Sequence, residues 1–560
     1  MEATLPSETW RVLGLEMDPG EDERVLVERA AAELGLGPDE LRGARIARLA
    51  LDARRRGGER RLRLIGHVDL VLAPGRRSKA FGRAQRAGRV QPAPEAEALE
   101  RGDLHASWRA GPPPRVAVVG SGPAGLFAAL ALVRNGLEVT LIERGPMLRE
   151  RGRSLARFHR TRVPDPERNL LFGEGGAGTY SDGKIYTRVD DPLEVTLLEE
   201  LVECGAQPEI VYHSLAHIGT DRLHRVLPRL RERLEAAGTT FRFDTRVEGL
   251  IEGPGGVDGA RVVRALATSA GELACDAVVL AVGHSARDTW DVLARQGVAF
   301  EAKPFQRGLR IEHPQELIDR GRYGGRDERL GAASYNLVCK ADARGPAAFT
   351  FCMCPGGRIV ASVNEPGHLC TNGMSNSRHS SAWATSAVVT TWGPREFGEG
   401  AFAGVEFQHR LERLFFEEGG GNYTAPAQTA ADFLAGRLSS GLRHTTYPFG
   451  TRPARLDRLL PEAGVRALAR ALERFDAQLE GFAGPEGTFV GLESRSSGPL
   501  RIPRGRDDRR ARGFANLYPV GEGAGYAGGI MSAALDGARS ALALVAAGRP
   551  DPAPAAPPRP

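Results

Sequence analysis

The sequence predicts an α/β protein in which a parallel sheet covered by helices is joined to a mixed antiparallel lobe and a small N-terminal α+β module. Three observations predict this. An apolar strand at 115–119 runs directly into a glycine-rich turn and an apolar helix. Buried strands of the same kind return at 277–283 and near 517. Alternating strands interrupted by Gly, Ser and Asn fill the region from about 300 to 490, which is typical of an antiparallel sheet.

The glycine turn after the first strand is the most informative stretch of the chain. Gly120, Gly122 and Gly125 have the spacing of a dinucleotide-binding turn. The first glycine allows the tight bend, the second lets the backbone approach a pyrophosphate, and the third lets the helix pack against the strand. The helix that opens with Pro123 and Ala124 directs its free N–H groups at the phosphates. This pattern predicts a Rossmann-like domain with a bound dinucleotide, and a glycine-rich loop without a ligand is the alternative.

A second apolar strand ends in Glu143, 18 residues after Gly125. Its carboxylate is expected to accept hydrogen bonds from ribose hydroxyls. The next residue, Arg144, is predicted to lie in the same site.

We predict the following division of the chain. The small α+β module takes 1–72, with strands near Trp10–Leu15, Ile46–Arg54 and Arg60–Leu72 and a helix over Glu21–Leu34. A linker rich in Arg, Ala, Gly and Pro follows at 73–114, and a Pro/Ala tail at 548–560 should be disordered. The dinucleotide domain takes 115–300 and 491–547, and the substrate or cap lobe takes 301–490.

Bulk composition places the chain among cytoplasmic proteins of several domains. At 560 residues it is too long for one core. No basic segment followed by an apolar run opens the chain, and no uninterrupted apolar stretch reaches the ~18 residues that span a bilayer, so no membrane span is expected. Six scattered cysteines argue against a disulfide framework.

Charge is distributed unevenly near the N-terminus. Residues 41–90 carry 15 Lys or Arg against 3 acids, a net charge of +12. A solvated surface is the ordinary interpretation, and a patch for RNA is the sharper one. Nucleic acid is not favoured, because Phe81 is the one aromatic residue available for base stacking in this stretch.

Three further segments resemble those of the flavoprotein superfamily that includes glutathione reductase. They are the glycine-rich loop 173–184, the strand and turn 276–283, and the strand and turn 517–525. The resemblance implies that the dinucleotide is FAD. In the third segment Glu522 stands where Asp is usual at the flavin's ribityl chain. The helix after it would point its N-terminus at the flavin pyrimidine oxygen, and Val247 would lie near the adenine.

On this resemblance, residues from all four segments are expected to bind the cofactor. Besides those of the glycine turn and its acid, they are Gly175, Gly176, Thr179, Ser181, Asp182, Lys184, Val247, Gly283, Gly521, Glu522, Gly529, Ile530 and Met531.

The combined motifs at 173–184, 283–289, 352–357 and 521–530 resemble a family of poorly characterised bacterial FAD-dependent dehydrogenases with an N-terminal α+β extension. The resemblance covers nearly the whole chain. It implies an oxidoreductase in which one FAD accepts a hydride from an organic small molecule held between the FAD domain and the cap lobe. Electrons would leave to oxygen, a quinone or a partner protein.

Two alternatives stay open. The first is an RNA-directed flavoprotein that docks nucleic acid through the basic 41–90 segment. The second is a flavin-binding assembly protein with little turnover. The chain shows no second strand–glycine turn–helix unit, so a dedicated nicotinamide domain is not expected.

Two residues are candidates for catalysis. His284 follows the buried strand 277–283 at its carboxyl end, where ligands gather in α/β sheets, and could move protons near neutral pH. Its alternative is a turn histidine bonded to backbone. Arg495 lies in a donor-rich segment and could clamp a substrate carboxylate or phosphate, with surface exposure as the alternative. Arg287 and Asp288 are expected to pair with each other.

Cys352 and Cys354 are the one close cysteine pair in the sequence. Strand alternation would place both sulfurs on one face. Three interpretations remain: buried small apolar residues, a redox-active or strained pair, or part of a metal site. No metal is expected, because nothing nearby supplies further ligands at suitable spacing.

Overall fold

A five-stranded parallel sheet lies at the centre of the predicted dinucleotide domain. The structure is a computed structural model, and it describes residues 8–56, 59–75, 77–95, 97, 99, 113–255, 259–343 and 345–548. The sheet has the order β25-β13-β7-β8-β9, and every neighbouring pair is parallel. Its strands are β7 (Arg115–Val119), β8 (Glu138–Ile142), β9 (Thr240–Arg242), β13 (Ala277–Leu280) and β25 (Leu517–Pro519). The α/β class predicted from the sequence is confirmed.

Both faces of this sheet are covered, which explains why its strands are continuously apolar. Alternate side chains of β7 point to opposite sides: Val116 and Val118 pack with the helices, and Ala117 and Val119 pack with a second, three-stranded sheet. The helices are α4 (Pro123–Arg134), α6 (Leu193–Glu203), α7 (Thr220–Ala236) and α15 (Ile530–Ala547). The antiparallel sheet consists of β10 (Val247–Glu252), β11 (Val263–Thr268) and β12 (Gly271–Ala274).

A mixed seven-stranded sheet, order β16-β17-β20-β15-β23-β21-β22, forms the predicted cap lobe. Its strands are β15 (Phe305–Pro314), β16 (Val338–Cys339), β17 (Ala348–Cys354), β20 (Trp383–Trp392), β21 (Ala425–Thr429), β22 (Thr451–Pro453) and β23 (Thr488–Glu493). Helices α11 (Ala403–Glu418) and α14 (Glu462–Asp476) pack on one face of the sheet with Leu309 and Ile311. Because β23 runs to Glu493, the last strand of this sheet crosses the boundary predicted at 490.

A short hairpin and a strand pair complete this region. The hairpin consists of β18 (Gly357–Ala361) and β19 (Thr371–Ser375). The pair of β14 (Glu301–Ala302) with β24 (Leu500–Arg501) lies where the chain enters and leaves the larger sheet. The remaining helices used below are α5 (Leu148–Thr161) and α8 (Arg287–Arg295).

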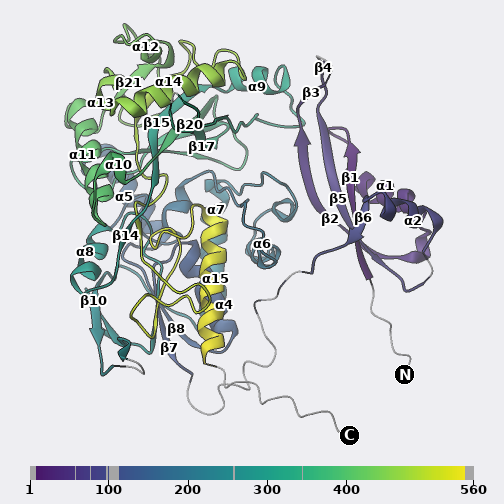
Figure 1. Cartoon of the computed structure of the whole chain (residues 1–560), viewed down its shortest axis with the longest axis horizontal. Helices are drawn as coiled ribbons and strands as arrows, with labels where there is room; N and C mark the ends of the chain where they lie inside the picture. The colour runs from purple at the N-terminus through teal and green to yellow at the C-terminus, as the bar shows by residue number, and fades with distance from the viewer. Residues whose placement is uncertain are drawn as a thin grey trace.

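The N-terminal module has β-α-β-β-α-β order with strands arranged β2-β5-β1-β6, a ferredoxin-like pattern. Its elements are β1 (Glu8–Met17), α1 (Arg24–Leu34), β2 (Leu41–Asp52), β5 (Arg63–Leu72), α2 (Lys79–Arg86) and β6 (Val90–Pro92). The prediction of a linker from 73 is therefore wrong over its first part, because α2 and β6 complete the module. Figure 1 shows this module, in purple, at one side of the molecule.

The module joins the rest of the chain through the outer edge of β2. The Leu49 amide donates to the Tyr212 carbonyl at 2.7 Å, and the Ser214 amide donates back to the Leu49 carbonyl at 2.9 Å. The Tyr212 hydroxyl donates to Glu23 at 2.7 Å. These contacts cover an edge that would otherwise present unpaired backbone groups.

Helix α15 is long and apolar enough to cross a membrane by length and composition. It nevertheless carries Asp536 and Arg539, and 67% of its residues are buried inside the protein. Figure 1 shows it beside α4. Gly537 makes this contact close, because a Cβ there would lie 2.0 Å from the Ala124 carbonyl oxygen. We describe it as a core helix. Of the tail predicted to be disordered, 549–560 lie outside the described residues.

Candidate cofactor and active site

The four glycine segments singled out in the sequence meet at the carboxyl edge of the parallel sheet. A Cβ on Gly176 would lie 3.0 Å from the Gly122 Cα, and one on Gly521 would lie 2.9 Å from the Ala124 Cβ. A Cβ on Gly178 would lie 3.1 Å from Ile530. These contacts bring segments from 120 to 530 to one place, as the sequence predicts.

Two helix N-termini open into this place without a side-chain cap. Helix α4 begins after Gly122, with Pro123 at its first position, and α15 begins after Gly529. The first amides of each helix are therefore available to a negatively charged or oxygen-rich ligand.

The glycines of the first turn differ in what surrounds them. A Cβ on Gly125 would lie 1.8 Å from the Gly120 carbonyl oxygen, and one on Gly120 would lie 2.3 Å from the Ala281 carbonyl oxygen. Both positions therefore require glycine for the backbone to pack this closely. Gly122 faces open space, with no atom within 4 Å of its Cβ position, and the same holds for Gly283. This combination of packed and open glycines fits a dinucleotide whose phosphates approach the backbone at Gly122.

Glu143 is 5% exposed, and both of its carboxylate oxygens accept hydrogen bonds within the protein. One oxygen accepts from the amide and hydroxyl of Ser121, at 2.9 and 2.7 Å. The other accepts from the amides of Gly145 and Gly173, both at 2.9 Å. In this structure Glu143 therefore ties the glycine turn to the Gly173 loop, and its contact with ribose stays a prediction.

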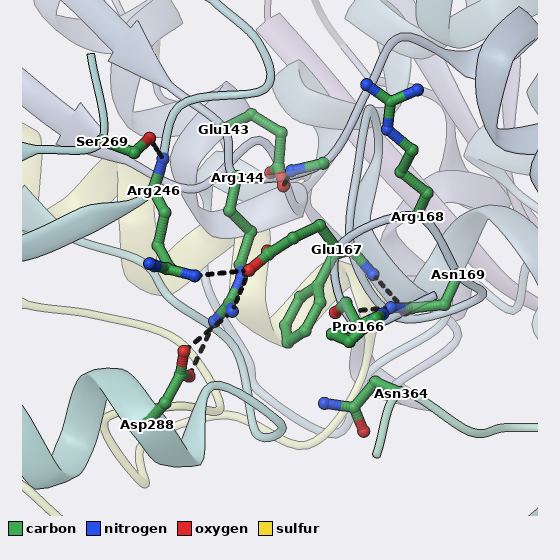
Figure 2. A network of polar contacts seen from close by, with 12 residues as sticks. Glu143, Arg144, Pro166, Glu167, Arg168, Asn169, Arg246, Ser269, Asp288 and Asn364 are labelled. Atoms are coloured by element: carbon green, nitrogen blue, oxygen red, sulfur yellow. Dashed lines mark hydrogen bonds and ion pairs between the residues drawn. The ribbon is translucent and has the colours of Figure 1, made fainter. Parts of the chain in front are cut away.

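Arg144 belongs to a network of ion pairs beside the turn (Figure 2). Its guanidinium pairs with Glu167 at 2.6 Å and with Asp288 at 2.8 Å, and Arg246 pairs with Glu167 at 2.9 Å. The predicted Arg287–Asp288 pair is therefore wrong, because Asp288 pairs with Arg144. Val247, the first residue of β10, is buried and follows Arg246 directly.

The Gly173 loop is organised by Arg151 of α5, a fully buried residue that sequence reasoning missed. Its guanidinium donates to the carbonyls of Glu174, at 2.6 Å, and Gly176, at 3.1 Å, and to the Thr179 hydroxyl at 3.2 Å. Gly175 adopts a φ of 82°, and its amide donates to the Ser121 carbonyl at 3.1 Å. No local sequence signal marks Arg151, since its partners follow it by about 20 residues in an irregular loop.

The end of the Gly173 loop carries a polar cluster. Asp182 is 2% exposed and pairs with Lys184 at 2.5 Å and with His379 at 3.2 Å. Burial would raise the pKa of Asp182, but Lys184 and His379 hold it well below the usual range. Ser181 bonds within its own loop, to the Gly178 carbonyl at 2.7 Å.

Gly521 and Glu522 lie in the turn that follows β25. Burial raises the pKa of Glu522 to about 8, against the opposing charge of Lys303. Gly521 is fixed through its amide, which donates to Asp536 of α15 at 2.8 Å. Met531, in the first turn of α15, is 1% exposed.

The turn with His284 packs on the turn with Glu522, because a Cβ on Gly523 would be 2.4 Å from the Gly283 carbonyl oxygen. Both turns adjoin Gly498, whose Cβ would be 3.7 Å from the His284 Cβ and 3.2 Å from the Glu522 carbonyl oxygen. The His284 Nδ1 lies 2.7 Å from the Ser285 hydroxyl. Burial, together with the charges of Arg495 and Arg287, lowers the pKa of His284 to about 4. The imidazole is therefore neutral at neutral pH.

Arg495 is 5% exposed and belongs to a buried charge network. Its guanidinium donates to Glu412 at 3.0 and 2.8 Å and to the Ser285 hydroxyl at 3.3 Å, and it also bonds Asn364. The predictions of a surface position and of a substrate clamp do not fit these contacts, because Glu412, Ser285 and Asn364 occupy its donors.

Glu412, on α11, is the centre of this network and was not identified from the sequence. It also pairs with Arg287 at 3.1 Å, and Arg287 pairs in turn with Glu365 at 3.0 Å. A continuous chain of contacts thus runs from Glu412 through Arg495 and Ser285 to His284. The predicted catalytic residues are brought together by partners up to 210 positions apart in sequence.

Two groups of side chains could hold a metal ion by proximity, with ligand atoms within 4.8 Å of one another. They are Asp182 with His217 and His379, and Glu365 with His368 and His409. In each group a cation already pairs with the carboxylate: Lys184 in the first and Arg287 in the second. The absence of a metal stays a prediction.

Comparison with known proteins finds two families and one relative that match parts of the chain. Residues 304–496 match the family described as "FAD-dependent protein, C-terminal domain-like", and residues 51–163 match "Pyridine nucleotide-disulphide oxidoreductase". An uncharacterised protein of Clostridium beijerinckii is 40% identical over 436 residues, which cover 77% of this chain and 80% of that protein.

Solved structures with partial similarity include CtdE and a glycine oxidase. CtdE in complex with FAD is 12% identical, with coverage of 77% of this chain and 84% of its own and a TM-score of 0.31. Glycine oxidase of Bacillus cereus is 12% identical, with coverage of 78% and 96% and a TM-score of 0.32. The family matches identify the cofactor as FAD, and the chain belongs to the family of FAD-dependent oxidoreductases.

Proposed function

We propose that a single bound FAD accepts a hydride from a small organic substrate held between the parallel sheet and the seven-stranded sheet. The convergence of the four glycine segments at two uncapped helix N-termini carries this proposal. We assign the FAD-binding part to 115–300 and 491–547 and the cap lobe to 301–490, with β23 shared at the boundary.

The glycine turn would hold the pyrophosphate, with Gly122 as the point of closest approach and the amides of α4 as donors. Glu143 would position this turn against Gly175 and Gly176 by its hydrogen bonds to Ser121 and Gly173. Asp182 and Lys184 close the same loop, which would follow the edge of the ring system.

At the flavin end, bound FAD supplies the hydride-accepting chemistry. The amides at the start of α15 would lie toward the ring's oxygens, where a positive dipole end favours negative charge. Gly283 has no atom within 4 Å of its Cβ position, so its turn leaves room beside it for a planar group. Glu522, which is protonated at neutral pH by its raised pKa of about 8, would act as a hydrogen-bond donor.

His284 is the group that we assign to substrate deprotonation. Its pKa of about 4 leaves it uncharged and able to accept a proton at neutral pH. Arg495 would act through Ser285 as a positioning residue, since its own donors are occupied.

The open space at Gly122 gives a direct test. Gly122→Ala should fold normally, because no atom lies within 4 Å of its Cβ position, yet lose FAD affinity by about tenfold or more because the methyl group occupies the phosphate position. Gly152→Ala, on α5, also has nothing within 4 Å and should retain FAD. Flavin absorbance after gel filtration measures both variants. Equal flavin content in the two, or a wild-type protein that FAD does not colour, would contradict the proposal.

A screen of electron donors that follows anaerobic bleaching of the flavin would identify the substrate class. We expect bleaching by at least one small organic donor. Bleaching by NADPH alone would contradict the direct-substrate proposal and indicate that a nicotinamide docks without a second glycine turn.

A further inference from the structure

Cys352 and Cys354 lie at an irregular position in β17. The pairing of β17 with β20 shifts between Phe351 and Cys354, which marks a β-bulge, and Cys352 adopts a left-handed φ of 44°. A residue with a β-carbon rarely takes this conformation, and such strain concentrates at functional sites.

The bulge brings the two thiols into contact. The Cys354 sulfur donates to the Cys352 carbonyl at 3.3 Å. Cys352 is partly exposed, whereas Cys354 is fully buried. The pair therefore has one thiol that a small molecule can reach and one that it cannot.

Two cations flank the pair. Arg310, with no exposed surface, donates to the Cys352 carbonyl at 2.9 Å and to the Cys354 sulfur at 3.6 Å. Lys184 donates to the Met353 carbonyl between the two cysteines. Gly373 makes room for this arrangement, because a Cβ there would overlap the Arg310 guanidinium and lie 3.1 Å from the Cys354 sulfur.

Other charged groups also face the pair. Asp182 partners Lys184, and Glu493 partners Arg310 at 3.1 Å. Tyr186 lies two residues after Lys184, and burial raises its pKa further above the neutral range. Cys354 lowers the pKa of Cys352 below its usual range, and the charges of Lys184 and Arg310 act in the same direction against burial.

In three other cysteines the pKa of the thiol is raised instead of lowered. Burial raises the pKa of Cys204 and Cys370 to about 11 and that of Cys275 to about 12. These three thiols are unreactive by position and serve as internal standards.

We propose that Cys352 and Cys354 form a redox-active dithiol that exchanges with low-molecular-weight disulfides. The Cys352 thiolate attacks one sulfur of the small disulfide, a mixed disulfide forms, and one thiolate leaves and takes a proton from water. Cys354 then attacks the Cys352 sulfur, and its proton leaves with the second small thiol. The pair loses two electrons and the small disulfide gains them, so two thiols are released for each Cys352–Cys354 bond formed.

The pair lies against the cofactor cradle through Lys184, yet this exchange needs no flavin. A failure of this inference would therefore not contradict the function proposed above, and the reverse also holds. A protein without flavin that still forms the Cys352–Cys354 bond would contradict that function and support this inference.

The test uses full-length protein equilibrated with oxidised glutathione, followed by alkylation, digestion and mass spectrometry. We expect a peptide in which Cys352 and Cys354 are joined. Cys352→Ser and Cys354→Ser should each abolish the bond, and Cys370→Ser should leave it intact. Cys354→Ser should instead accumulate glutathione on Cys352.

Alkylation kinetics give a second readout. At pH 7 Cys352 should react with iodoacetamide about tenfold or more faster than Cys204, Cys275 and Cys370. Lys184→Met should slow this reaction and move its pH midpoint upward, and Lys184→Arg should restore both. The inference is overturned if folded protein forms no Cys352–Cys354 bond in excess oxidised glutathione, or if Cys352 reacts no faster than the three standards.

Discussion

Glu412 has no exposed surface and lies between the guanidinium groups of Arg287 and Arg495. Glu412→Ala should lower the free energy of unfolding by about 3–5 kcal/mol, because it leaves two buried cations without their counterion. Urea unfolding measures the change. Glu462→Ala is the matched control: its side chain is 84% exposed in an ion pair with Arg466, and its loss should cost less than about 0.5 kcal/mol. Equal costs would contradict the proposed role of the network.

The buried and paired carboxylate of Glu412 should also make stability depend on pH. Burial would raise the pKa of Glu412, but Arg287 and Arg495 hold it well below the model-compound value of 4.5. The carboxylate therefore contributes stability above about pH 4.5 and loses it as the pH falls below that value, where the unfolded chain binds the proton first. Melting temperatures at pH 7 and pH 4 should show a smaller acid loss in Glu412→Gln than in the wild type.

The assignment of His284 as the base predicts how the rate of flavin reduction depends on pH. With a pKa of about 4, its imidazole should give a rate of flavin reduction that is flat from pH 6 to 9 and falls below about pH 5. His284→Gln should reduce that rate by about 10²–10⁴-fold, and His159→Gln, which alters a ring packed on Phe449, should not. Stopped-flow absorbance with an active donor measures both. A midpoint near pH 6.5 would contradict the assignment.

At the scale of elements, the strand–turn–helix at 115–134 was predictable because its signal is local: the glycine spacing, the apolar strand and the first-position proline lie within 20 residues. Helix α2 and strand β6 were not predicted because their local sequence signal is weak. Their Arg- and Gly-rich composition hides the few apolar residues that pack, Phe81 and Ala84 among them, and a Ser78 cap that accepts from the Phe81 amide at 3.0 Å.

The close contact between α4 and α15 gives the prediction at this scale. Gly537→Ala should lower the melting temperature and the flavin content together, because the added Cβ would lie 2.0 Å from the Ala124 carbonyl oxygen and push the helices apart. The cost should be about 1–3 kcal/mol. Gly122→Ala should lower flavin content alone. Normal stability in Gly537→Ala would show that the two helices can separate freely.

For the whole molecule, the order of sheets along the chain was foreseeable and the charge network between them was not. Each strand is recognisable from a local run of apolar residues. Glu412, Arg495 and Ser285, in contrast, become neighbours only when the chain has folded. The Gly173 loop shows both cases: its glycines are visible in sequence, but Arg151, which fixes their carbonyls, is not.

The basic segment 41–90 supports a prediction about the full-length protein. Phe81, the aromatic residue of this segment, is 2% exposed and packs edge-on against Trp10, so its ring offers no face for base stacking. We expect no measurable affinity for a single-stranded RNA in fluorescence anisotropy at low salt. Salt-dependent binding would revive the nucleic-acid alternative.

The long separation in sequence between α4 and α15 has a consequence for biosynthesis. The ribosome releases the glycine turn about 400 residues before it releases the helix that packs on α4. Until that helix emerges, α4 has an uncovered apolar face and the site lacks one wall. We therefore expect FAD to be loaded only after α15 has emerged, and a product that stops before Gly521 to be degraded as a misfolded chain instead of persisting as a partly active enzyme.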